Sequence, residues 1–175
     1  MDALQYRTLP TIVQALSRLE GDERLRVDTS LLAEMQNYTA YSKTLRDISA
    51  ARYKTREDLH TLATPYEEVQ FMRGRVLRVK TGHLPVLRVL KRVWAACTTA
   101  LHEVPELTKL SPAARRDALF VTVLEPLRER LDDCELVIET ATEVEKLLAN
   151  AHFTLKELRN INEAFLEELR RDRNR

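Results

Sequence analysis

The clearest pattern in the sequence is a seven-residue repeat of apolar positions that runs from Cys134 to Leu169. Apolar residues recur at alternating spacings of three and four, which is typical of a helix that packs in a coiled coil. The repeat positions hold ten apolar residues and one polar residue: Cys134, Ala141, Leu148, Leu155, Asn162 and Leu169, and Val137, Val144, Ala151, Leu158 and Phe165. We therefore predict a long coiled-coil helix within residues 112–171.

A weaker apolar series predicts a second long helix over residues 28–63. Its apolar positions are Leu31, Tyr38, Tyr41, Leu45, Ile48, Leu59 and Leu62, and their spacings are three, four or seven once Arg52 and Thr55 are counted as seam positions. Glu34, Arg52 and Thr55 interrupt this series, which favours a mixed helical bundle over a simple zipper.

The two stripes together predict a seam that binds partner helices. Its residues are Val144, Leu148, Leu155, Leu158, Asn162, Phe165, Leu45 and Ile48. A buried Asn in such a seam fixes register and strand number at some cost in stability, so we expect Asn162 to select partner and register. The pattern leaves open whether the long helices pair with each other or with another chain.

The remaining segments are shorter and lie between prolines. We predict a short amphipathic helix within residues 1–25 and a basic helical segment over 66–102, interrupted at "KTGH" (80–83). Residues 103–112 contain two prolines and are expected to form a loop. The last helix should begin near Pro112, and Pro126 would permit a kink in it.

Composition narrows the fold class to all-α. The 175-residue chain contains three glycines, far below the roughly 7% that is usual, so hairpins and glycine-rich nucleotide loops are improbable. We expect one elongated helical unit over 1–175, with two long helices and shorter connecting ones. The N-terminus lacks the pattern of a signal peptide, and no apolar run is long enough to span a membrane.

Charge is distributed unevenly along a nearly neutral chain. Residues 69–102 hold seven basic residues and no acidic ones: Arg73, Arg75, Arg78, Lys80, Arg88, Lys91 and Arg92. Residues 103–169 are acidic, with eight basic and fifteen acidic residues. We expect the basic face to pair with acidic helices, in this chain or in a partner. A plain solvated face, or binding of nucleic acid or anionic lipid, are the alternatives.

Candidate chemistry is sparse. The four histidines and two cysteines share no metal-ligand spacing, and the acidic pairs on the last helix are typical of a solvated face. Cys97 and Cys134 are expected to be core thiols in a reducing compartment. We therefore predict no catalytic residues, no metal and no cofactor.

The order of elements resembles a known family. The Pro65 break, the "EVQFM" helix start at 68–72, an apolar helix to Leu101, a two-proline loop and the acidic "DDCELVIETATEVEKLL" at 132–148 resemble dynactin subunit three. The similarity extends over residues 60–170 and rests on Gln70–Phe71, Cys134 and Leu147–Leu148.

This resemblance implies a non-catalytic subunit of a cytoplasmic, cytoskeleton-associated complex that links dynein to cargo. With the seam, it leads us to expect a scaffold subunit that pairs its helices with other helical subunits of a hetero-oligomeric complex. The alternatives are a basic helical protein that binds or packages nucleic acid, and a self-assembling viral or cytoskeletal protein. The identity and stoichiometry of the partners stay open.

Overall fold

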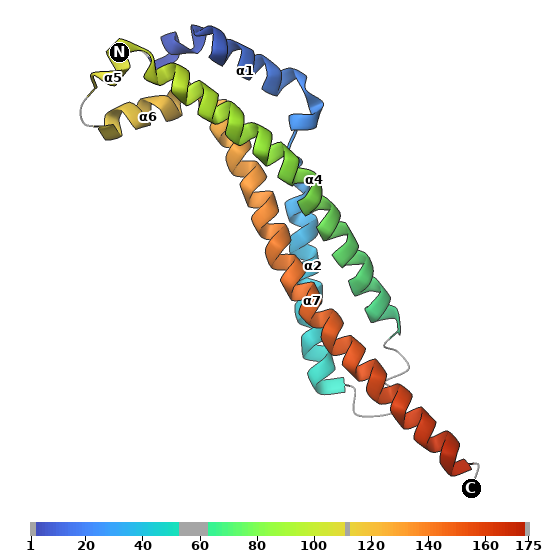
Figure 1. Ribbon diagram of the computed structural model, residues 1–175. Coiled ribbons are helices and arrows are strands. Elements are labelled where there is room, and N and C mark those ends of the chain that lie inside the picture. Colours follow the sequence, from blue (N-terminus) through green and yellow to red (C-terminus); the bar gives the residue numbers. More distant parts are fainter. Residues whose placement is uncertain (1–2, 53–62, 111–112, 174–175) are drawn as a thin grey trace. The chain divides into compact units, whose positions relative to one another are not determined.

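A computed structural model describes residues 3–52, 63–110 and 113–173 of the chain (Figure 1). Within these ranges, the structure describes the backbone alone for residues 3, 46–52, 63, 114–115, 162, 165 and 172–173. The described residues form helices and no strand, which confirms the all-α prediction. The elements are η1 (Ala3–Thr8), α1 (Pro10–Gly21), η2 (Glu23–Leu25), α2 (Ser30–Arg52), α4 (Ala63–His102), α5 (Pro105–Thr108), α6 (Ala113–Val123) and α7 (Glu125–Arg173).

The helices group into two compact units, where the sequence led us to expect a single one. Unit 1 comprises residues 1–29 and 81–138, and unit 2 comprises residues 30–80 and 139–175. Both α4 and α7 contribute residues to each unit. These two are the longest described helices, with 40 and 49 residues, and α2 is described over 23 residues.

Unit 1 has a continuous apolar core. Helix α1 begins with Pro10 in its first turn and presents Ile12, Ala15 and Leu19 on one buried face. This face belongs to the same core as Leu90 and Leu101 of α4. The short helix α5 lies inside the predicted loop 103–112 and adds Leu107, which is fully buried.

The predicted break at residues 80–83 is wrong, because α4 runs through it without interruption and contains Pro85. Proline removes one helical hydrogen bond and crowds the carbonyl of the residue four positions earlier. Val76 and Leu90, on either side of the expected break, are both fully buried. Burial of the apolar stripe on both sides offsets the cost of the proline, so the helix continues.

The predicted helix over 112–171 is divided at Leu124 into α6 and α7. Pro126 has no N–H and cannot continue α6, but it fits the first turn of a new helix. The division leaves carbonyl groups at the end of α6 without helical donors. The Arg7 guanidinium donates hydrogen bonds to two of these carbonyls. Its Nε lies 2.9 Å from the Val123 carbonyl oxygen, and its Nη2 lies 3.0 Å from the Thr122 carbonyl oxygen.

Unit 2 is a three-helix arrangement of α2, the first part of α4 and the later part of α7. Helix α4 is antiparallel to α2, because Glu34 contacts Arg75 while Tyr41 donates to Glu68. It is also antiparallel to α7, because Lys80 contacts Glu145 while Gln70 contacts His152. Helix α2 is described from Ser30 to Arg52, and residues 53–62 of the predicted 28–63 helix lie outside the described residues.

Candidate partner-binding surface

The predicted seam is largely occupied within the chain. Leu148 is fully buried, Val144 and Leu155 are 2% exposed, and Leu45 is 6% exposed. All four lie in unit 2, where the three helices cover them. Their assignment as partner-binding residues therefore changes to core residues: the stripes on α2 and α7 pack in cis, the outcome that the sequence left open.

Among the remaining seam residues, the structure describes the side chain of one. Leu158 is only half-buried. Ile48, Asn162 and Phe165 lie within α2 and α7, but their side chains are outside the described set. Their role in binding partners stays a prediction.

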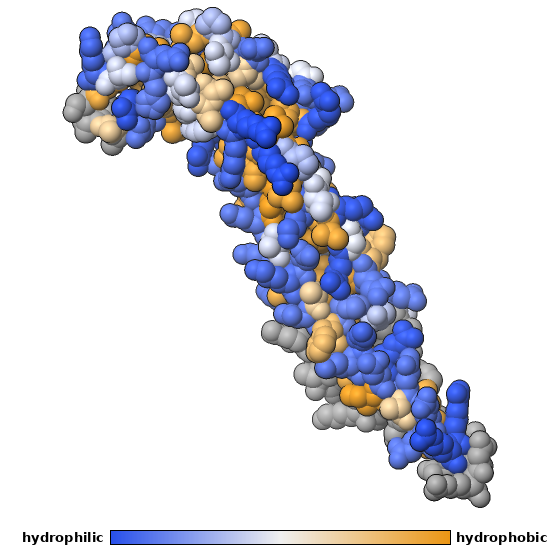
Figure 2. All heavy atoms as spheres, viewed as in Figure 1, coloured by the Kyte–Doolittle hydropathy of each residue, from blue (hydrophilic) through white to orange (hydrophobic). Residues whose placement is uncertain are grey.

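Among the described side chains of α7, Leu155 is the last buried residue of the repeat. Among the described side chains of residues 156–171, none is buried. Ile161 is 60% exposed, and Leu158, Leu166 and Leu169 are half-buried. We refer to these four residues as the C-terminal stripe. Figure 2 shows apolar surface between charged side chains on the visible face of the C-terminal part of the chain.

Three residues of the basic face pair with acidic residues of the same chain. The Nζ atoms of Lys80 and Lys91 each lie 2.8 Å from a carboxylate oxygen of α7, in Glu145 and Glu135 respectively. Arg75 Nε lies 2.8 Å from a carboxylate oxygen of Glu34 on α2. Such partly exposed pairs contribute about 0.2–1 kcal/mol each. Part of the basic face therefore pairs with acidic residues of the same chain.

The other basic-face residues differ in environment. Arg88 and Arg92 are exposed, and no acidic side chain of the described residues lies within ion-pair distance of either. Arg73 is half-buried and Arg78 is exposed.

An aromatic and basic cluster joins α4 to α7 in unit 2. The Tyr66 and His152 rings stack with their centroids 4.8 Å apart, and Gln70 Nε2 lies 3.2 Å from His152 Nε2. The Arg159 guanidinium carbon lies 5.8 Å from the centre of the Tyr66 ring. Burial lowers the pKa of His152, and Arg73 and Lys156 lower it further. The cluster therefore favours a neutral imidazole.

Tyrosines of α2 form polar links to acidic residues in unit 2. Tyr38 donates a hydrogen bond to Glu34, the same carboxylate that pairs with Arg75. Burial and then this carboxylate raise the pKa of Tyr38 to about 12. Tyr38 therefore remains a donor at neutral pH, and Glu34 is held between two helices.

A cavity of about 110 Å³ lies between α2 and α7 of unit 2. Its apolar lining comes from Leu45 of α2 and from three residues of α7: Leu147, Ala151 and Leu155. Its polar lining is Ser42, Lys43, Asn150 and Thr154. No sequence signal pointed to this cavity, because it depends on how two separate helices pack.

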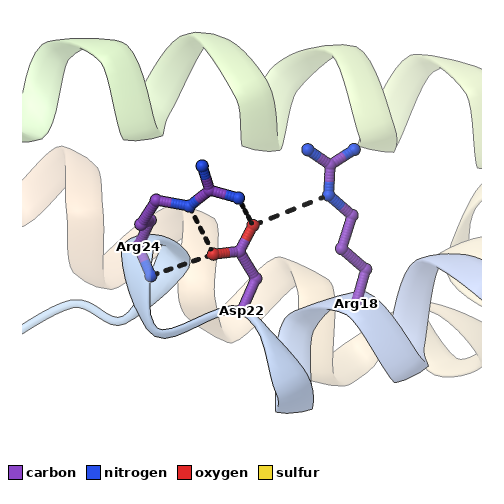
Figure 3. A network of polar contacts seen from close by, with 3 residues as sticks. All are labelled: Arg18, Asp22 and Arg24. Atoms are coloured by element: carbon purple, nitrogen blue, oxygen red, sulfur yellow. Dashed lines mark hydrogen bonds and ion pairs between the residues drawn. The ribbon is translucent and has the colours of Figure 1, made fainter.

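A polar network in unit 1 fixes the turn after α1 (Figure 3). Arg24 Nε lies 2.9 Å from Asp22 Oδ1, and the backbone N–H of Arg24 donates to the same oxygen. Arg18 Nε approaches Asp22 Oδ2 at 4.0 Å. The hydrogen bond from the Arg24 side chain is the main cause that lowers the pKa of Asp22. The network therefore closes a turn and leaves the arginines exposed.

The described residues offer no other chemistry that points to a function. Cys97 and Cys134 are free thiols in the core, and burial raises the pKa of each, so neither is an activated nucleophile. No cluster of metal-ligating side chains occurs in the described part of the chain. Over the same residues, no helix combines the length and the apolar character needed to cross a membrane.

No protein-family model, curated protein or solved structure matches this chain. The resemblance to dynactin subunit three therefore remains a prediction from the residues that carry it.

Proposed function

We propose that this chain is a non-catalytic structural subunit that assembles into a larger complex by pairing its helices with helices of other subunits. The C-terminal stripe on α7 is the docking element. We assign docking to this stripe and not to the buried residues of the predicted seam, because those residues already pack within unit 2.

The observation that carries the proposal is the change in burial along α7. The apolar repeat continues past Leu155, yet none of the described side chains of residues 156–171 is buried. A helix with an exposed apolar stripe gains stability when a partner covers that stripe. A partner helix that continues the packing would bury Ile161 and the leucines on either side of it.

The resemblance to dynactin subunit three supports a cytoplasmic, motor-associated complex as the setting. A subunit of that kind acts through its surfaces and carries no reaction chemistry. The buried, unactivated thiols are compatible with this role.

Nucleic-acid binding by the basic face has less support. Arg75, Lys80 and Lys91 each contact a carboxylate of the same chain, so they are less available to phosphates. The rest of the basic face consists of four arginines, Arg73, Arg78, Arg88 and Arg92, which are fewer than the 6–10 phosphate contacts of a strongly salt-dependent binder.

The proposal is tested with Ile161→Asp, because Ile161 is exposed and its replacement spares the core. The matched control is Asn160→Asp, which places the same carboxylate one residue away at an exposed position outside the stripe. Tagged full-length chains are used to capture partners from native extract, and the captured proteins are quantified by mass spectrometry. We expect Ile161→Asp to lose a set of partners by about tenfold or more, and Asn160→Asp to retain them.

Equal recovery of partners by the wild type and Ile161→Asp would show that the stripe is not a docking element. Enrichment of RNA or DNA that depends on Arg88 and Arg92 would instead favour the nucleic-acid alternative. Helical circular dichroism of both variants checks that the fold is unchanged.

A further inference from the structure

The cavity between α2 and α7 has the properties of a receptor for one apolar side chain. Its volume of about 110 Å³ compares with the roughly 150 Å³ of an apolar cavity that accommodates benzene. Leu147 and Asn150 belong to one turn of α7, and Ala151 and Thr154 to the next, while Ser42 and Leu45 face them from α2. In packed helices, a hole formed by residues of this spacing receives a side chain from a neighbouring helix.

The charge beside the cavity indicates which kind of helix could place a side chain in it. Lys43 lines the cavity, and it is the only charged residue of α2 between positions 36 and 45. A helix that places an apolar side chain in the hole and acidic residues beside it would meet both the apolar lining and Lys43.

The chain itself contains a segment with this chemistry. Residues 160–169 read "NINEAFLEEL" and hold three acidic residues and no basic ones. Within them lie Ile161, Leu166 and Leu169 of the exposed C-terminal stripe. Glu163 pairs with Arg159 on the same helix, which leaves Glu167 and Glu168 as the acidic residues suited to meet Lys43.

The segment cannot reach the cavity of its own chain. Residues 147–155, which line the cavity, and residues 160–169 belong to one uninterrupted helix, α7. A continuous helix rises about 1.5 Å per residue and does not fold back on itself, so the 160–169 segment always lies beyond the cavity along the helix axis. Only the segment of another molecule can enter.

We propose that the cavity between α2 and α7 receives an apolar side chain from residues 160–169 of a second copy of this chain. The inference rests on the proposed function, because it uses the same stripe and names one of its partners. Since each copy carries both the hole and the segment, a symmetric pair of copies would fill both holes.

The inference is tested on the full-length chain by light scattering after size exclusion, over protein concentrations from micromolar to about 100 µM. Ala151→Leu fills the cavity from within, and Ala96→Leu adds the same side chain at an exposed position of unit 1 as a control. We expect the wild type and Ala96→Leu to dimerise and Ala151→Leu to weaken dimerisation by about tenfold or more. A wild type that stays monomeric, or a dimer indifferent to Ala151→Leu, overturns the inference.

A charge exchange keeps the test valid if Ala151→Leu fails to fold. Lys43→Glu should weaken dimerisation about twofold to fivefold, and the matched control Arg92→Glu should not. Glu167→Lys with Glu168→Lys should weaken it as well, and combination with Lys43→Glu should restore it. Failure of the combined variant to recover would argue against this pairing.

The results separate this inference from the proposed function. A monomeric chain that still captures partners through Ile161 overturns the second-copy pairing and leaves the proposed function standing. Equal capture of other proteins by the wild type and Ile161→Asp, together with an Ala151-dependent dimer of the wild type, would do the reverse: it would overturn the proposed docking of other subunits and leave the second-copy pairing standing.

Discussion

Residues 139–155 and residues 156–171 of α7 carry the same seven-residue repeat, yet the structure treats them differently. In the first segment, the repeat positions Ala141, Val144, Leu148 and Leu155 are buried by the helices of unit 2. In the second, no described side chain is buried. The repeat therefore identifies which face of a helix is apolar, and it does not say whether the covering surface belongs to the same chain or to another one.

The comparison is tested most strongly by placing a carboxylate in each segment. Leu155→Asp removes a buried leucine, which costs about 2–5 kcal/mol, and buries an unpaired charge in addition. We expect unit 2 to lose its cooperative packing in this variant. Ile161→Asp, at an exposed position of the C-terminal stripe, should change the free energy of unfolding by less than about 0.5 kcal/mol.

Urea unfolding followed by circular dichroism, at a concentration low enough to keep the chain monomeric, measures both variants. Similar losses of stability would mean that the two segments are equally covered in the isolated chain, and the contrast between them would disappear.

A smaller effect is expected from the ion pairs that fix the first segment to α4. Lys80→Gln removes the contact with Glu145, and both side chains are less than a third exposed. We expect a loss of about 0.5–1 kcal/mol in the free energy of unfolding. Arg88→Gln, which removes an exposed charge with no ion pair to the described residues, should stay within about 0.5 kcal/mol of the wild type.

Thermal unfolding at low and high salt distinguishes these variants, because screening weakens the Lys80 pair and should reduce the difference between them. A Lys80→Gln variant as stable as Arg88→Gln at low salt would show that the ion pair between Lys80 and Glu145 adds nothing to the stability of unit 2.

The smallest effect should come from His152, which lies near the end of the buried segment. Its pKa is lowered in the folded chain, so the unfolded chain binds the proton more readily. Its contribution to stability is complete above the ordinary pKa of about 6.5 and is lost as the pH falls below that value. Wild-type stability should therefore decrease from pH 7 to pH 5 more than that of His152→Gln.

Nuclear magnetic resonance of the four histidines measures this directly. We expect His152 to titrate below the ordinary histidine pKa of about 6.5, because burial and the nearby Arg73 and Lys156 lower its pKa. A His152 pKa at or above 6.5 would contradict the description of the Tyr66–His152 cluster.

The local sequence pattern predicts where most helices lie, but it does not predict where the helices begin and end. Periodicity correctly located α1, α2 and the long C-terminal helix, because each buries a stripe that can be read from one segment. The Lys-Thr-Gly-His stretch was expected to end a helix, yet burial of Val76 and Leu90 carries α4 across it. The opposite happened at Leu124, where a kink was expected and the helix is divided.

The candidate site could be predicted only in part. The acidic character of α7 led to the expectation of pairing with basic helices, and Lys80 and Lys91 do contact it. The individual pairs depend on how the antiparallel helices are aligned, which no single segment encodes. The cavity at Lys43 and the role of Arg7 arise from residues far apart in sequence, so no local signal reveals them.

The Arg7 contact has a consequence for the order in which this protein is made. Its acceptors, the carbonyls of Thr122 and Val123, lie 115 and 116 residues further along the chain. At about 5–20 residues per second, a ribosome needs on the order of ten seconds to add them. The N-terminal η1, which carries Arg7, therefore emerges before these acceptors exist, and its contact with α6 forms only once α6 has been synthesised. The core of unit 1 includes Tyr6 of η1 and Phe120 of α6, so it is completed only after translation has passed α6.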